Sequence, residues 1–270
     1  MRRVAICLFL SFLAGACGGG RAAKQSAASA SPGASSTPGS SASPGNTNGA
    51  SSNKATAAPG LPRAAPLSGP IATTGTPPKT GTYTFNVTLD AKRSTRDVVV
   101  TSEGGSAAAT KQGEKTSSDS ASSTQHVIWR KDGKYLADIA TKQGSNNYDC
   151  NFEPDLVEYK FPLKVGAKWS GTSSCTLTIG AVKVKSTIHE TATVTGKGEV
   201  TIGGRRVKVW IINQVLDSSS EYGTRKYSGQ SKRATQYAPE VGLAVRYSEN
   251  STSGDRSSNA TYELQSTQPK

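Results

Sequence analysis

The chain has 270 residues, a formal net charge of +13, 34% hydrophobic residues and only 6% aromatic residues. The charge is uneven, because residues 1–80 contain no acidic residue and residues 81–270 carry only +6. No basic run is interleaved with aromatic residues, so we expect no nucleic-acid partner. General attraction to an anionic envelope polymer is the more sensible expectation for a basic domain of this kind.

The first seventeen residues have the pattern of an export signal. Arg2 and Arg3 precede an apolar run, Val4 to Leu13, that is far shorter than the roughly 20 residues a membrane-spanning helix needs. The following stretch, Leu13-Ala14-Gly15-Ala16-Cys17, resembles the lipobox of bacterial lipoproteins, with Ala14 where that family usually has leucine. The resemblance implies a signal peptide over residues 1–16 and an acylated Cys17 that anchors the chain to the membrane outside the cytoplasm. The alternative is an ordinary secretory signal that contains a cysteine.

The four cysteines divide in a way that suits an exported protein. Cys7 leaves with the signal and Cys17 takes the lipid, which leaves Cys150 and Cys175 as one pair in an oxidising compartment. A bridge between them would close a loop of about 26 residues and stabilise the fold by roughly 3 kcal/mol. We expect no metal and no cofactor, because His126 and His189 show no ligand spacing with the two cysteines.

Residues 17–80 are predicted to be a disordered tether that begins at the lipidated cysteine. Alanine, serine, glycine and proline occupy 44 of the 63 positions from 18 to 80, and the stretch contains no aromatic residue. Such a composition cannot bury enough apolar surface to offset the entropy lost on ordering. The expected role of the tether is reach, since it would hold a folded domain away from the membrane.

Residues 81–270 are predicted to form one β domain. Apolar and polar residues alternate along Gly81–Leu89, along Val182–His189 and along Arg205–Ile212, as in half-buried strands. Asp132-Gly133 and Gly203-Gly204 separate adjacent strand-like runs and indicate hairpins. The fold class is therefore mostly β, a single antiparallel meander of about 10–12 strands, arranged as a curled sheet, half-barrel or barrel.

Residues 102–123 are polar and nearly free of large apolar side chains. They fit either a long loop or a polar two-strand extension of the sheet. The extension is favoured, because structureless loops of this length are uncommon inside a domain.

Three stretches of the C-terminal half form a recurring pattern. They are Phe161-Pro162-Leu163 with Gly166 and Trp169, Gly198-Glu199-Val200 with Gly203-Gly204, and Tyr237-Ala238-Pro239 with Gly242, Leu243 and Val245. Together they resemble a group of uncharacterised secreted β-sheet proteins of bacterial envelopes, which implies a curved antiparallel sheet over residues 155–265. That group is similar in outline to the curved-sheet carriers of the lipoprotein-localisation type, although the helices that those carriers pack in the sheet have no counterpart in this sequence.

No catalytic constellation emerges from the sequence, and we expect a protein that is not an enzyme. His126 and His189 lie on the polar faces of their strands, and no serine sits in a Gly-x-Ser-x-Gly elbow. The carboxylates around Pro154 lack the alternating ligands of a calcium loop, so a solvated loop is favoured there. These carboxylates are Glu153, Asp155 and Glu158.

Aromatic side chains are the remaining candidates for a site. They fit either an apolar binding face or the ordinary core of the sheet, and the low aromatic content favours the core. The five residues are Trp129, Phe161, Trp169, Trp210 and Tyr237.

The sequence leaves two functions open. The first is a non-enzymatic binding or interaction module of the cell envelope, anchored through Cys17, monomeric, and directed at a protein, an anionic polymer or an apolar ligand. The second is a lipid or lipoprotein carrier with an apolar cavity inside the curled sheet. A filled core favours the module, whereas a large apolar cavity favours the carrier.

Overall fold

The computed structural model describes residues 60–118, 121–144, 146–179 and 182–270. The predicted signal, Cys17 and the tether as far as residue 59 lie outside these ranges. All regular elements within the described ranges are strands. In order they are β1 (Gly81–Leu89), β2 (Lys92–Ser106), β3 (Ala109–Ser117), β4 (Ala121–Arg130), β5 (Gly133–Gln143), β6 (Asn146–Lys160), β7 (Lys168–Ile179), β8 (Val182–Ile202), β9 (Arg205–Tyr222), β10 (Arg225–Ala238), β11 (Leu243–Ser253) and β12 (Arg256–Leu264).

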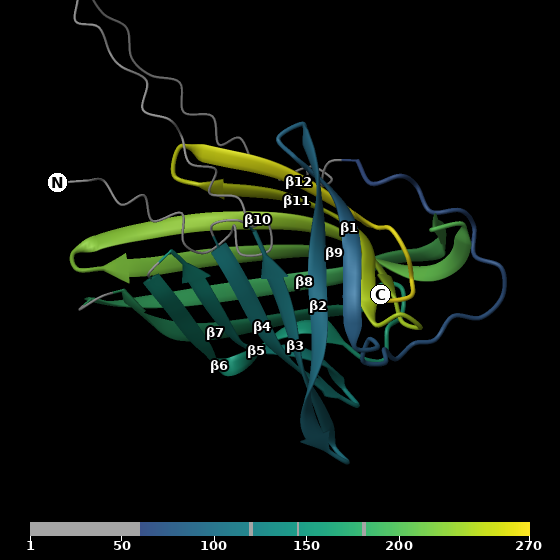
Figure 1. Cartoon of the computed structure of the whole chain (residues 1–270), viewed down its shortest axis with the longest axis horizontal. Helices are drawn as coiled ribbons and strands as arrows, with labels where there is room; N and C mark the ends of the chain where they lie inside the picture. The colour runs from purple at the N-terminus through teal and green to yellow at the C-terminus, as the bar shows by residue number, and fades with distance from the viewer. Residues whose placement is uncertain (1–59, 119–120, 145, 180–181) are drawn as a thin grey trace, which may run out of the picture. The chain divides into compact units, whose positions relative to one another are not determined.

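The twelve strands form a closed antiparallel barrel (Figure 1). Each strand pairs with its neighbours in the sequence, and β1 closes the ring by pairing with β12, for example Val87 with Tyr262. This arrangement confirms the predicted meander and selects the barrel among the three shapes left open. The described ranges contain no helix long and apolar enough to cross a membrane.

The strand periodicity appears in the barrel as predicted. Tyr83, Phe85 and Val87 of β1 are buried, and the residues between them are half-buried or exposed. The Gly203-Gly204 hairpin joins β8 to β9, with both glycines at positive φ, where other residues would be strained. The other predicted hairpin joins β4 to β5.

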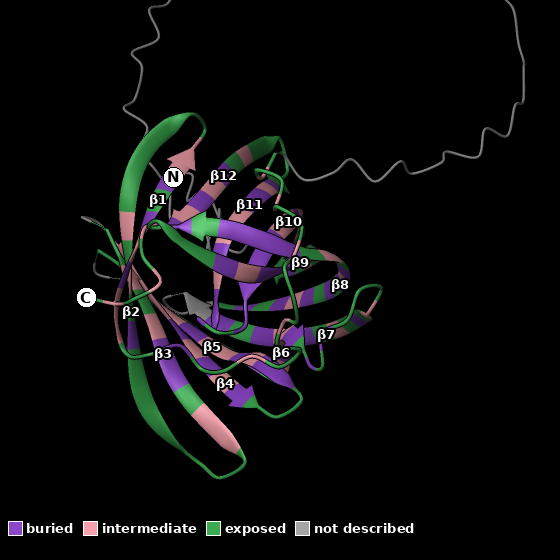
Figure 2. Cartoon of the chain, turned by 90° about the vertical axis from the view of Figure 1, so that its right-hand side faces the viewer, coloured by how far each residue is buried: buried purple, intermediate pink, exposed green. Residues whose placement is uncertain are grey.

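Of the polar stretch from 102 to 123, residues 102–117 form the ends of β2 and β3 with their turn, residues 121–123 begin β4, and residues 119–120 lie outside the described ranges. β2 and β3 pair out to Ser106 and Ala109, with a register shift between Ser102 and Gly105. Most of this end of the hairpin is exposed (Figure 2). The two-strand extension is therefore confirmed, and backbone pairing rather than side-chain burial holds it in the sheet.

The buried side chains form two clusters, and the long β8–β9 hairpin contributes to both. Ala192 and Val194 of β8 belong to the first cluster, whereas Val200 and Ile202 belong to the second. A register shift between Val194 and Gly196 lies between the two groups. Such a bulge bends a strand and changes the direction of its side chains. One hairpin can therefore cover two parts of the core.

Among the described residues, the seam between β6 and β7 has the sparsest pairing of the barrel. There one residue pair, Glu153 with Ser174, connects the two strands in register. The disulfide between Cys150 and Cys175 crosses the same seam, with a Cα–Cα distance of 5.3 Å, and confirms the predicted bridge. The Ser173 hydroxyl also donates to the Pro154 carbonyl. A covalent link thus holds the barrel closed where the hydrogen-bond ladder is weakest.

We expect a Cys150→Ala/Cys175→Ala variant to lose about 3 kcal/mol of unfolding free energy, since the bridge restricts the unfolded chain. Urea unfolding, compared with the oxidised parent, measures this loss. Reducing the parent with a thiol should lower the midpoint of unfolding to that of the double variant. An unchanged midpoint after reduction would show that the seam does not need the bridge.

The last part of the predicted tether is ordered against the barrel. Residues 60–78, called the strap from here on, run beside the sheet, and Ala65 exchanges two backbone hydrogen bonds with Glu199 of 2.8 and 2.9 Å. Ile71 packs on the first cluster and Ala64 on the second. The predicted boundary at residue 80 is thus too late by about twenty residues. The strap is held mainly through its backbone, which composition does not reveal.

Candidate functional site at the strapped end of the barrel

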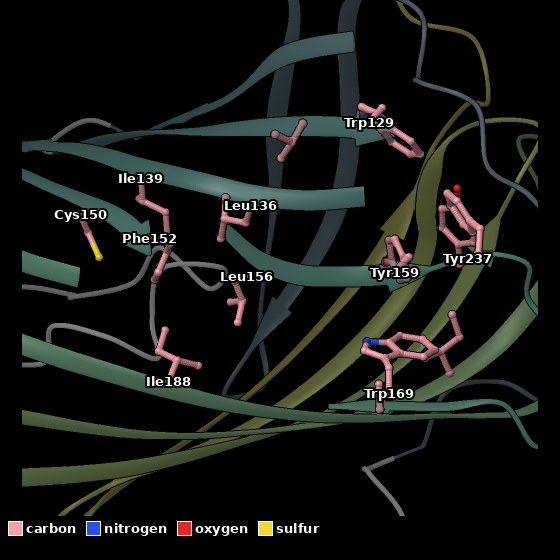
Figure 3. Close-up of a cluster of buried hydrophobic side chains, with 14 of the residues drawn as sticks. Trp129, Leu136, Ile139, Cys150, Phe152, Leu156, Tyr159, Trp169, Ile188 and Tyr237 are labelled. Carbon is pink, nitrogen blue, oxygen red and sulfur yellow. The ribbon is translucent and has the colours of Figure 1, made fainter. Parts of the chain in front are cut away.

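The five aromatic residues proposed from the sequence are all buried in the first cluster. Their exposed fractions range from 0% for Tyr237 to 7% for Trp169. The centroid of the Phe161 ring lies 6.4 Å from the centroids of both the Trp129 and the Tyr237 rings. Tyr159 stacks on Tyr237 with 4.4 Å between ring centroids, and Figure 3 shows these two side chains beside each other. The structure thus places them as core residues, and none offers an exposed aromatic platform.

The strap closes directly over this aromatic group. A Cβ on Gly75 would lie 1.9 Å from the Tyr237 hydroxyl oxygen and 2.7 Å from the Phe161 ring, so only glycine fits there. The Leu163 amide donates to the Thr73 carbonyl at 2.7 Å. Leu163, which belongs to the Phe161-Pro162-Leu163 motif, therefore helps to bind the strap. The Tyr237 hydroxyl is buried beneath it and has no hydrogen-bond partner among the described residues.

Next to the aromatic group lies a buried lysine held by two carboxylates. Lys134 Nζ is 2.7 Å from Glu114 Oε1 and 2.9 Å from Glu158 Oε2, and its side chain is 6% exposed. The ammonium also lies 5.5 Å from the Trp129 ring centroid. Burial by itself would lower the pKa of Lys134, but attraction to the two glutamates outweighs burial and raises the pKa. Lys134 is therefore a fixed cation of the interior.

A second buried carboxyl group, Glu190 on β8, forms no ion pair with any described residue, although the charge of Arg233 acts on it. Its neighbour is the Gln214 amide, which donates to Glu190 Oε1 at 3.0 Å. Burial raises the pKa of Glu190 to about 8, although the bond from Gln214 opposes the shift. Glu190 is therefore mostly protonated at neutral pH, which removes a charge that the core could not solvate.

A third buried polar group joins β10 and β11. Arg233 Nη2 lies 3.4 Å from Glu249 Oε2, and both side chains are largely buried. The hydroxyl groups of Ser231 and Ser251 donate to Glu249 Oε1 at 2.6 and 3.0 Å. Arg233 also lies over the Tyr247 ring at 5.7 Å from its centroid. The charges in this group are paired with one another and are not presented to solvent.

The histidines lie outside this region and make local polar contacts. His126 Nδ1 lies 2.7 Å from a Glu103 carboxylate oxygen, and its Nε2 lies 3.7 Å from Asp138. His189 Nδ1 contacts the Thr172 hydroxyl at 2.9 Å. No cluster of three or more metal-ligating side chains occurs among the described residues.

The loop carboxylates proposed from the sequence do not act together. Asp155 pairs with Arg130 at 2.8 Å, Glu158 pairs with Lys134, and Glu153 is exposed. All three belong to β6 rather than to a loop. The structure therefore gives them separate surface and core contacts.

The interior charges were missed at the sequence level, although one signal was present. Glu190 lies two residues from Ile188 and from Ala192, so strand alternation already places it on the buried face. Lys134 likewise lies two residues before the buried Leu136, although it directly follows a turn. Its burial depends on Glu114 and Glu158, which come from other strands.

A polar pocket of about 280 Å³ lies where the strap, the barrel and the C-terminal residues meet. Lys79 and Arg205 contribute cations and Glu240 contributes an anion to its wall. The remaining lining residues are Thr76, Pro77, Tyr83, Val241, Thr267 and Gln268.

The site thus defines a class of protein: a closed twelve-stranded barrel with an apolar, partly charged interior and one end covered by the strap. No protein-family model and no curated protein matches the chain. Three solved structures are similar to 72–73% of it at low identity.

The first is the hypothetical lipoprotein YmcC from Escherichia coli, with 13% identity, 92% of that chain covered and a TM-score of 0.32. A chain from Parabacteroides distasonis, provisionally assigned as a lipoprotein, has 11% identity, 99% coverage and a TM-score of 0.38. A chain from Bacteroides fragilis, provisionally assigned as exported and described as YmcC-like in fold, has 9% identity, 98% coverage and a TM-score of 0.29. Likenesses of this size establish neither a shared family nor a shared function.

Proposed function

We propose that this protein is an extracytoplasmic lipoprotein, anchored through Cys17, whose barrel is a non-enzymatic interaction module of the cell envelope. The apolar run, the small residues before Cys17 and the lipobox resemblance support export and acylation. An acyl anchor with two or more chains suffices for stable membrane attachment.

The observation that carries the extracytoplasmic location is the disulfide. Cys150 and Cys175 are both buried and their Cα atoms lie 5.3 Å apart, within the range that a disulfide requires. Such bridges persist in secreted and envelope proteins and are rare where thiols are kept reduced. The bridge and the signal-like N-terminus therefore support the same compartment independently.

The residues that line the described interior favour an interaction module over a carrier. The first cluster places aromatic and aliphatic side chains of β4 to β10 in contact with one another inside the barrel. Lys134, Glu158 and Glu190 add polar groups there, which an apolar ligand could not satisfy. The partner of such a barrel would therefore bind to its outside or to its strapped end.

The anchor is tested by a Cys17→Ala variant. The parent should fractionate with the membrane, and the variant should be released into the soluble extract, because the acyl chains are absent. Mass spectrometry of the parent should find an acylated peptide that begins at Cys17. A Cys7→Ala variant is the matched control and should behave like the parent, since Cys7 leaves with the signal. Equal membrane fractionation of the parent and the Cys17→Ala variant would refute the anchor.

A further inference from the structure

Most of the hydrogen bonds that hold the strap are made to its backbone. Four barrel side chains donate to strap carbonyl oxygens at 2.8–2.9 Å, namely Lys208 to Pro70, Trp210 to Ala72, Gln112 to Pro78 and Gln236 to Pro62. Three of these carbonyls belong to prolines, which favour an extended chain. The barrel thus recognises an extended, proline-containing segment in the way that peptide-binding grooves do.

Glycines on both sides set how closely the strap approaches. Gly75 of the strap has no room for a Cβ beside Tyr237. On the barrel, a Cβ on Gly198 would lie 2.6 Å from the Ala65 carbonyl oxygen and 2.7 Å from the Ala64 side chain. The strap and its groove therefore fit each other at two separate positions.

The strap joins β1 through a short exposed hinge. Lys79 and Thr80 are exposed, and Gly81 has a φ of +134°, which suits glycine alone. The polar pocket, lined in part by Lys79, lies beside this hinge. A change of direction here would redirect the strap without disturbing the β1 pairing that follows.

We propose that the groove accepts the strap of a second copy of this chain, so that two copies join by exchanging straps. The exchange preserves every bond of the strap, because the second copy presents the same segment, and such swapping is a low-cost route to dimers. Each barrel with its own strap is complete as a monomer, and the dimer forms where copies are concentrated.

The exchange of straps rests on the proposed function in one respect only: the anchor sets the membrane on which the two copies meet. Anchoring at Cys17 would confine the copies to one membrane and raise their effective concentration. The 43 residue-to-residue steps from Cys17 to Gly60 can span at most about 150 Å. Neighbouring anchors therefore lie within reach of one strap-exchanged pair.

The test uses two complementary variants of the full chain, both carrying Cys17→Ala so that acylation plays no part. Gly75→Ala obstructs the strap and leaves the groove open, whereas Gly198→Ala obstructs the groove and leaves the strap intact. When the two variants are mixed, the intact strap of the Gly198→Ala chain can bind in the open groove of the Gly75→Ala chain. Sedimentation measures the mass, and circular dichroism with thermal melts verifies that each variant is folded.

Each variant alone should sediment at the mass of one chain, and the equimolar mixture should shift toward the mass of two chains as its concentration rises. A Gly75→Ala/Gly198→Ala chain mixed with Gly75→Ala is the control and should stay monomeric, because neither chain has an intact strap. A monomeric mixture of two folded variants would overturn the proposal. That result would not affect the test of acylation at Cys17, which is measured separately.

A second experiment covers the case in which either variant does not fold. A protease site inserted between Lys79 and Thr80 of the Cys17→Ala chain converts the strap into a separate fragment after folding. The fragment should stay bound, and an excess of synthetic peptide 60–79 should displace it, whereas a scrambled peptide should not. A fragment that the synthetic peptide cannot displace would show that the groove does not exchange straps.

Discussion

A Lys134→Met variant should lose about 3–5 kcal/mol of unfolding free energy at pH 7, measured by urea denaturation. The substitution keeps the length and apolar stem of the side chain and removes only the ammonium. Glu114 and Glu158 would then face each other in the core without the cation that now lies 2.7 and 2.9 Å from them. Buried carboxylates without a counter-ion are costly, because the interior solvates charge poorly.

Two further measurements separate this cause from a general packing defect. The loss should be smaller at pH 4, where the carboxylates of the variant can take up protons. A Lys134→Met/Glu114→Gln/Glu158→Gln chain should recover much of the lost stability. Lys226→Met is the matched control, since Lys226 is 83% exposed in its pair with Glu221, and its effect should stay near zero. A loss independent of pH and not recovered in the triple variant would contradict the electrostatic explanation.

The fold could be predicted to the extent that it depends on local pattern. The alternation in β1, from Tyr83 to Val87, and the Gly203-Gly204 turn are properties of adjacent residues, and both appear in the barrel as predicted. The closure of the sheet is a long-range event. It depends on the pairing of β1 with β12, across nearly the whole domain, and no local pattern distinguishes a closed barrel from an open curled sheet.

The site was harder to predict because its polar groups obey a different rule from the apolar core. Strand alternation places Glu190 on the face of Ile188 and Ala192. A charged side chain is nevertheless expected in solvent whatever its register, so neither Lys134 nor Glu190 was recognised as an interior residue. Lys134 is tolerated inside because two other strands supply carboxylates, and Glu190 because it holds a proton. Neither condition can be seen in a single stretch of sequence.

The order of the strap was also not predictable from local sequence, because composition predicts disorder there. Its composition predicts a chain that cannot bury apolar surface, and most of its side chains are indeed exposed. Its order comes from backbone groups that find donors such as Gln112 and Trp210 on distant strands. Composition measures what side chains can bury and does not measure which carbonyls will be bonded.

The raised pKa of Glu190 predicts a pH dependence of stability that one substitution should remove. The unfolded chain loses this proton near pH 4.5, whereas the folded chain keeps it up to about pH 8. Between these values folding takes up one proton, so this group lowers the unfolding free energy by roughly 1.4 kcal/mol for each unit of rising pH. A Glu190→Gln variant should match the parent near pH 4.5 and exceed it by up to about 4 kcal/mol near pH 8.

Glutamine is the informative replacement because its amide oxygen can still accept the bond from Gln214, so the packing and the hydrogen bond both remain. The difference between the variant and the parent, followed by urea unfolding from pH 4.5 to 9, isolates this one group from all others that titrate. Glu221→Gln is the matched control on β9, where the carboxylate is 56% exposed, and it should show almost no pH-dependent difference. A constant difference between Glu190→Gln and the parent across that range would mean that Glu190 is ionised in the folded barrel, and the core would then need a cation beside it.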